Sequence, residues 1–132
     1  MNKICTDIPQ SKRLAEILSL ESADMCFNIS QRSNMPPLMI PYSKFNEFFN
    51  IGETPDFLIP CWSLSALLDV LPKVIDRDYV INITQNSTNT WFITYDLFAD
   101  RDCSFNGLIS KSNSFVGACV EMIIKLKKLN LL

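Results

Sequence analysis

Three stretches of the chain repeat apolar residues at helical spacing, and each has a helix signal at one end. The first predicts a helix over Ile8–Ser19, because Asp7 can accept from free backbone N–H groups and Gln10 follows at the capping-box spacing. The second predicts a largely apolar helix over Trp62–Leu71, stopped by a proline. The third predicts a helix over Ser114–Leu129, whose last turns carry lysines that suit the negative end of the helix dipole.

Two segments alternate apolar and polar residues with a period of two, which is typical of β-strands. They cover Tyr79–Thr84 and Thr90–Leu97, and the polar loop between them has the length of a hairpin connection. One face of this hairpin carries the apolar side chains, namely Tyr79, Ile81, Ile83, Trp91, Ile93, Tyr95 and Leu97. We expect that face to pack against the helices.

Three further segments carry weaker strand signals. Ser22–Ser30 alternates apolar and polar residues and predicts a strand, whereas Leu38–Ile40, which precedes a proline, predicts an edge strand or an extended segment. Ala99–Asn113 contains Asn106 and Gly107, a dipeptide that favours a tight turn and therefore a short extra hairpin.

The middle of the chain has the least regular pattern. Ser43–Phe49 favours a short helix, and Glu53–Pro60 favours a loop because it contains two prolines. The order of elements predicts an α+β fold, in which an antiparallel sheet of three to five strands carries three helices packed mainly on one face. A length of 132 residues, 48% of them apolar, suits a single domain over residues 1–132.

Composition limits the cell compartments and the kinds of functional site that we expect for this chain. No apolar run reaches the ~18 residues of a membrane span, and the start of the chain has no export signal, so we expect a cytoplasmic protein without a membrane partner. The five cysteines are widely spaced and are interpreted as reduced thiols. Histidine is absent, which removes Ser-His-Asp triads, Cys-His dyads and histidine metal ligands and argues against an enzyme. The 12 basic and 14 acidic residues argue against a nucleic-acid partner.

Acidic residues give the first candidate for chemistry. Asp96, Asp100 and Asp102 are close in sequence, and Asp76 and Asp78 precede the hairpin. Clustered carboxylates can hold Ca²⁺ or Mg²⁺, but this spacing fits no EF-hand loop, and we favour the interpretation as a solvated strand end and loop. We assign no cofactor and no metal ligand. The alternative function that these residues leave open is a small carboxylate-dependent hydrolase or transferase, with or without a divalent cation.

Two further patterns each allow two interpretations. Cys61 precedes the second helix, where a thiol can become nucleophilic, yet no histidine is available as its base, and we favour the interpretation that Cys61 fills a gap in the core beside Trp62. The cluster of Lys125, Lys127 and Lys128 could contact phosphates, yet it also suits a helix C-terminus without any ligand.

Aromatic residues give the strongest functional lead. Tyr42, Phe45, Phe48, Phe49 and Phe57 crowd a proline-rich segment, which forms either a partner site on the surface or a cover over the core. Three apolar residues of the hairpin region should point away from the helices, namely Val80, Phe92 and Phe98. These features favour a non-enzymatic protein-binding module, with a protein partner or a second copy of the chain as its ligand.

A resemblance adds context to this interpretation. Three stretches of the chain carry it, namely residues 10–25, Ile59–Leu68 and Gly117–Leu126. In these stretches the chain resembles small uncharacterised proteins of prophages and conjugative elements in gut bacteria. The resemblance implies an accessory protein of a mobile genetic element, and it implies no activity, cofactor or catalytic residue.

Overall fold

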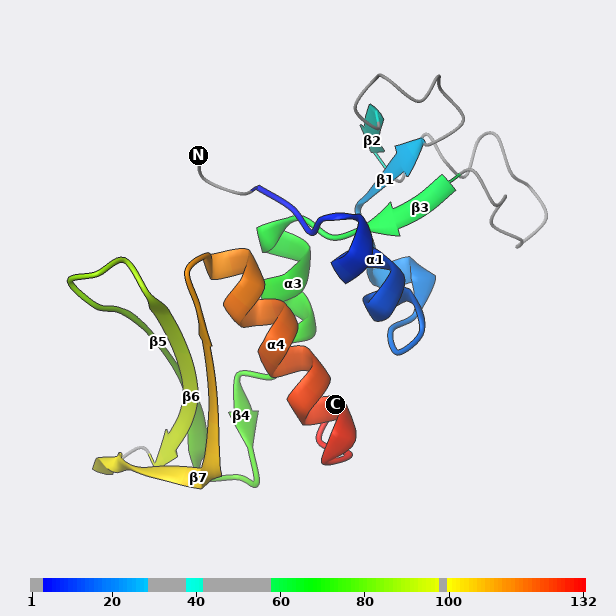
Figure 1. Ribbon diagram of the computed structural model, residues 1–132. Helices are drawn as coiled ribbons and strands as arrows, with labels where there is room; N and C mark the ends of the chain where they lie inside the picture. Colours follow the sequence, from blue (N-terminus) through cyan, green and yellow to red (C-terminus); the bar gives the residue numbers. More distant parts are fainter. Residues whose placement is uncertain (1–3, 29–37, 42–57, 98–99) are drawn as a thin grey trace.

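The structure is a computed structural model that describes residues 4–28, 38–41, 58–97 and 100–132. Its elements, in chain order, are α1 (Ile8–Ala15), the 3₁₀ turn η1 (Leu20–Ser22), β1 (Met25–Asn28), β2 (Leu38–Pro41), β3 (Leu58–Cys61), α3 (Leu64–Val70), β4 (Val74–Ile75), β5 (Tyr79–Gln85), β6 (Trp91–Leu97), β7 (Asp100–Ser112) and α4 (Phe115–Lys128). The predicted α+β fold is confirmed, with the strands divided between two antiparallel sheets (Figure 1). The helix predicted over Ser43–Phe49 lies outside the described residues.

Helix α1 begins with the predicted capping box. Asp7 Oδ1 accepts from the backbone N–H of Gln10 at 2.8 Å, and the Gln10 side chain accepts from the backbone N–H of Asp7 at 3.1 Å. The helix ends at Ala15, four residues earlier than predicted, and the chain continues as a turn in which the Ile17 N–H donates to the Leu14 carbonyl. That turn leads into η1, so the strand expected from Ser22 begins only at Met25.

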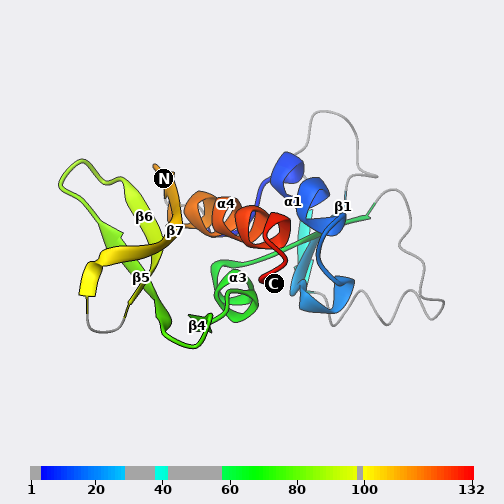
Figure 2. The same ribbon diagram turned by 90° about the horizontal axis from the view of Figure 1, so that it is seen from below.

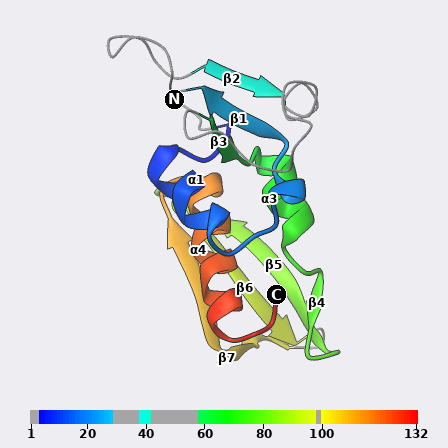
Figure 3. The ribbon, with the colours of Figure 1, turned by 90° about the vertical axis from the view of Figure 1, so that its right-hand side faces the viewer.

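The three-stranded sheet has the order β2–β1–β3 and lies at one end of the molecule (Figure 3). β1 pairs antiparallel with both neighbours, and Pro60 of β3 lies opposite Cys26. The loop expected over Glu53–Pro60 is therefore wrong for its last residues, which form β3. A proline lacks the N–H that a central strand needs, and Pro41 and Pro60 are both in the outer strands of this sheet, where that loss is tolerated.

The four-stranded sheet has the order β4–β5–β6–β7. β5 and β6 form the predicted hairpin, whose register runs from Tyr79 opposite Leu97 to Gln85 opposite Trp91. The extra hairpin expected within Ala99–Asn113 is wrong, because β7 is one strand. Asn106 and Gly107 have φ values of 47° and 65° and lie where the β6–β7 register shifts, so these left-handed residues form a bulge instead of a turn.

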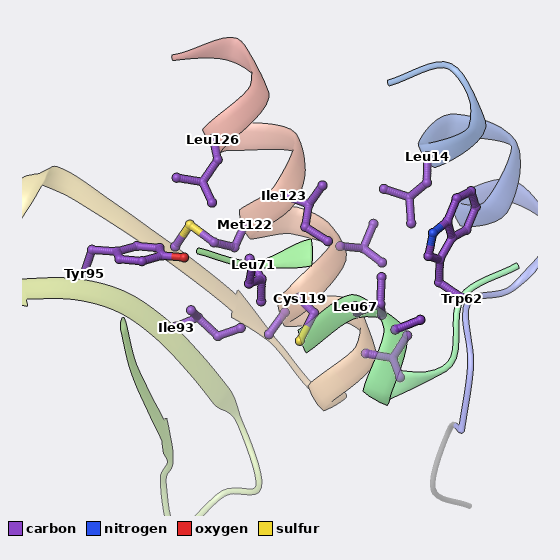
Figure 4. Packing of buried hydrophobic residues seen from close by; sticks show 14 of the residues in the cluster. Leu14, Trp62, Leu67, Leu71, Ile93, Tyr95, Cys119, Met122, Ile123 and Leu126 are labelled. Atoms are coloured by element: carbon purple, nitrogen blue, oxygen red, sulfur yellow. The ribbon is translucent and has the colours of Figure 1, made fainter. Parts of the chain in front are cut away.

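The main core lies between the four-stranded sheet and the helices. Helix α4 covers one face of that sheet, α3 packs against α4, and α1 packs on the side of α4 away from the sheet (Figure 2). Fully buried side chains fill the space between these layers, and Figure 4 shows them: Leu14, Trp62, Leu67, Leu71, Ile93, Tyr95, Cys119, Met122, Ile123 and Leu126. One buried cluster contains residues of α1, α3, β6 and α4, and apolar side chains of β5 pack against it. The predicted apolar face of the hairpin is therefore confirmed as a core face.

Candidate functional site

The four-stranded sheet has a second face that points away from the helices. Side chains alternate along each strand, and directly opposite residues share a face, so the strand registers define this surface. We call it the open face, and its residues are Val74, Val80, Asn82, Thr84, Phe92, Thr94, Asp96, Ile109 and Lys111. The chain neighbours of Val80 and Phe92 all belong to the core or pack against it, which confirms the assignment of these two residues from the sequence pattern.

Apolar side chains are unusually accessible on the open face. Val74 is 47% exposed and Ile109 is 43% exposed, although both are in strands of a sheet with a well-packed inner face. Val80 lies opposite Val74 and is half-buried. Phe92 is also half-buried and lies diagonally across from Ile109, and the Lys111 ammonium lies 5.9 Å from the centre of the Phe92 ring. The open face therefore offers two exposed apolar pairs, Val74 with Val80 and Ile109 with Phe92, and a cation lies beside the second pair.

A polar cluster lies in the middle of the open face. Asp96 is only 6% exposed, and its Oδ2 accepts from the Asn82 side-chain amide at 3.0 Å and from the Thr94 hydroxyl at 2.8 Å. These two donors satisfy the carboxylate within the sheet itself, so Asp96 has a structural role here. Buried polar groups of this kind also make an interface selective, because a partner must not remove their hydrogen bonds.

Two of the other predicted acidic residues lie in a turn of the four-stranded sheet. Asp76 and Asp78 are exposed in the turn between β4 and β5, where the Asp78 N–H donates to the Asp76 carbonyl at 2.8 Å. The side chains of Asp100 and Asp102 are outside those that the structure describes. Within the described residues, no group of three or more cysteine, aspartate or glutamate side chains could hold a metal ion.

The outer edge of β7 is covered by two side chains of α4. Glu121 accepts from the backbone N–H of Lys111 at 3.4 Å, and the Lys125 ammonium donates to the backbone carbonyl of Ile109. The two side chains also pair with each other, with 3.1 Å between Lys125 Nζ and Glu121 Oε1. This arrangement satisfies edge groups that would otherwise accept another strand. The sequence suggested that Lys125 either complements the helix dipole or contacts phosphates, whereas in the structure it covers the outer edge of β7.

The opposite edge of the sheet is less protected. β4 pairs only with the first two residues of β5, and the Ile81 N–H donates to the carbonyl of Lys73. Beyond that point, no strand lies beside β5 within the part of the chain that the structure describes. The apolar open face and this short free edge adjoin each other at β5.

Cys61 and Trp62 belong to the interior. Cys61 is fully buried, and its pKa is raised well above the usual range by that burial, with further contributions from Cys5 and Cys26. A thiol that stays protonated at neutral pH is a poor nucleophile. Trp62 is also fully buried, and its indole N–H donates to the Ser22 hydroxyl at 2.9 Å. These contacts assign both residues to packing.

The structure brings together some of the predicted binding residues and does not describe the others. Val80 and Phe92 share the open face, whereas Tyr42, Phe45, Phe48, Phe49, Phe57 and Phe98 lie outside the described residues. Val74 and Ile109 were missed by the sequence analysis. Val74 is in a strand of two residues, which is too short to show alternation. The face of the sheet on which Ile109 lies depends on the bulge at Asn106 and Gly107.

Comparisons with protein-family models, with curated proteins and with solved structures find no match to the chain. No helix among the described residues is both long and apolar enough to cross a membrane.

Proposed function

We propose that this chain is a non-enzymatic protein-binding module whose contact surface is the open face. The observation that carries the proposal is the accessibility of Val74 and Ile109 on one face of the sheet, with Val80 beside the first and Phe92 beside the second. Apolar side chains gathered on one face, with polar groups among them, are a common feature of protein-binding sites. A sheet face also binds with little loss of backbone freedom, because its strands are already ordered.

The free energy available on this face suits a reversible contact. Full burial of a valine or isoleucine side chain contributes about 1.5–3 kcal/mol, and these side chains are already about half covered. Covering the remainder of Ile109 contributes about 1 kcal/mol, which corresponds to roughly a fivefold change in affinity. Several such contacts, rather than one anchor, would have to act together.

A second copy of the chain is the partner to test first. Two open faces could meet around a twofold axis, which would bury the apolar residues of both copies in one self-complementary interface.

The test is sedimentation velocity of the full chain across concentrations from about 10 µM to 1 mM, the range in which a weak contact of this kind populates. We expect reversible dimers, and we expect Ile109→Lys and Phe92→Lys to remain monomers with unchanged circular dichroism. The matched control is Leu129→Lys, because Leu129 is 47% exposed but lies at the end of α4. Equal loss of association in the control variant would refute the open face as the contact surface.

Two expectations accompany this proposal without direct support from the structure. A cytoplasmic location stays a prediction from composition. Service to a prophage or conjugative element stays a prediction from the resemblance of residues 10–25, Ile59–Leu68 and Gly117–Leu126 to proteins of such elements.

A further inference from the structure

A groove of about 390 Å³ lies between α1 and α4. Its lining includes Pro9 on α1 and Val120 and Ile124 on α4, which are apolar. Val120 is 5% exposed and Ile124 is half-buried, so both form a floor that is continuous with the core. The groove can therefore receive an apolar side chain without any rearrangement of the fold.

The rim of this groove is positively charged. Arg13 on α1 and Lys128 on α4 are exposed at the groove, and neither has an ion-pair partner among the described residues. Glu121 and Lys125 also line it, but they neutralise each other in the ion pair beside β7. Two uncompensated cations thus flank an apolar floor, one on each wall.

We propose that the groove between α1 and α4 binds an acidic segment of a partner protein, with an apolar side chain on the floor and carboxylates at Arg13 and Lys128. The part of α4 that lines the groove runs from Gly117 to Lys128, which is about 16 Å at 1.5 Å per residue. That length matches about three turns of an amphipathic helix laid along the groove, a common mode of peptide recognition.

Charge and shape favour this ligand over a nucleic acid. A nucleic-acid site needs many cations and usually presents aromatic side chains for stacking, whereas this groove offers two free cations and no aromatic residue. The whole chain carries a net charge of −2, which opposes binding to a long polyanion. An acidic peptide with an apolar anchor satisfies both the rim and the floor.

The test uses two fluorescein-labelled synthetic helical peptides of about twelve residues, which span the groove at helical rise. One carries leucines on one face and glutamates elsewhere, and the other carries lysines in place of the glutamates. Fluorescence anisotropy with the full chain should show binding of the acidic peptide only, weakened by added salt. Arg13→Glu and Lys128→Glu should each weaken it roughly tenfold, since an attraction becomes a repulsion.

Matched controls separate the groove from general charge and from the open face. Lys12 and Lys127 are exposed on the same two helices but do not line the groove, so Lys12→Glu and Lys127→Glu should leave the affinity unchanged. Ile109→Lys, on the open face, should also leave it unchanged, which makes this test independent of the proposed function. Absence of acidic-peptide binding, equal losses in the two control variants, or tighter binding of a labelled oligothymidine would each overturn the proposal.

Discussion

Thr6 lies at a junction between the start of the chain and the entry to α3, and its hydroxyl is the subject of our most specific prediction. Thr6 is fully buried, and its Oγ1 accepts from the backbone N–H of Trp62 at 3.1 Å. The same hydroxyl lies 2.7 Å from the buried hydroxyl of Ser11, and the Thr6 N–H donates to the Trp62 carbonyl at 2.9 Å. One hydroxyl therefore joins the segment before α1, α1 itself and the segment before α3.

Replacement of Thr6 by valine keeps the shape of the side chain and removes its oxygen. The Trp62 N–H then has no acceptor in a region that water does not reach, and an unsatisfied buried donor costs about 1–3 kcal/mol. The Ser11 hydroxyl can turn toward a carbonyl of its own helix, which limits its share of the loss. We therefore expect Thr6→Val to lower the free energy of unfolding by about 2 kcal/mol, roughly a thirtyfold change in the unfolding equilibrium.

Urea unfolding followed by far-ultraviolet circular dichroism measures this change. With a slope of about 2 kcal/mol per molar urea, the midpoint should fall by about 1 M while the slope stays the same. Thr6→Ser retains the hydroxyl and loses only a methyl group, so it should cost about 1 kcal/mol. A Thr6→Val variant within about 0.5 kcal/mol of the unmodified chain, or less affected than Thr6→Ser, would refute the reasoning.

Three further predictions follow from single contacts. Ser114 caps α4 by accepting from the Gly117 N–H at 2.9 Å, so Ser114→Ala should lower stability by about 1 kcal/mol in the same urea assay, and an unchanged midpoint would contradict the cap. Gly107 has a φ of 65° with open space around it, so Gly107→Ala should cost about 1 kcal/mol from backbone strain alone, whereas a neutral result would mean that the bulge relaxes. Burial raises the pKa of Cys119 from 9.0 to about 12, so the unfolded chain loses this proton first as the pH rises. The associated stability is fully present below pH 9.0 and is lost between there and about 12, by roughly 1 kcal/mol per pH unit. Urea midpoints of Cys119→Ala should fall less steeply with pH over this window, and parallel curves for the two proteins would disprove the assignment.

The parts of the fold that the sequence predicts correctly depend on local patterns. The β5–β6 hairpin alternates over its whole length, and α4 repeats apolar residues through four turns, so each pattern admits one interpretation. β3 was missed because its strand character comes from pairing with β1, thirty residues earlier, and Pro60 suggests a loop when that pairing is unknown. The dipeptide at Asn106 and Gly107 signals two left-handed residues, which suit a turn and a bulge equally well.

The candidate surfaces were predictable only in part for a related reason. Val80 and Phe92 follow from alternation within one hairpin, and the structure places both on the open face. Ile109 follows a bulge that changes which residues of β7 face outward, so its position could not be counted from the strand's start. Arg13 and Lys128 come from opposite ends of the chain, and only the packing of α1 against α4 makes them the two walls of one groove.

The role of the open face can be measured most directly from the methyl NMR signals of the full chain as its concentration is raised. The methyl groups of Val74, Val80 and Ile109 should shift progressively with concentration, because a second copy covers them. Those of Ile4 and Leu129, which are 64% and 47% exposed elsewhere, should stay in place. Shifts confined to Ile4 and Leu129, or no shift in any of the five residues up to about 1 mM, would contradict self-association through this face of the sheet.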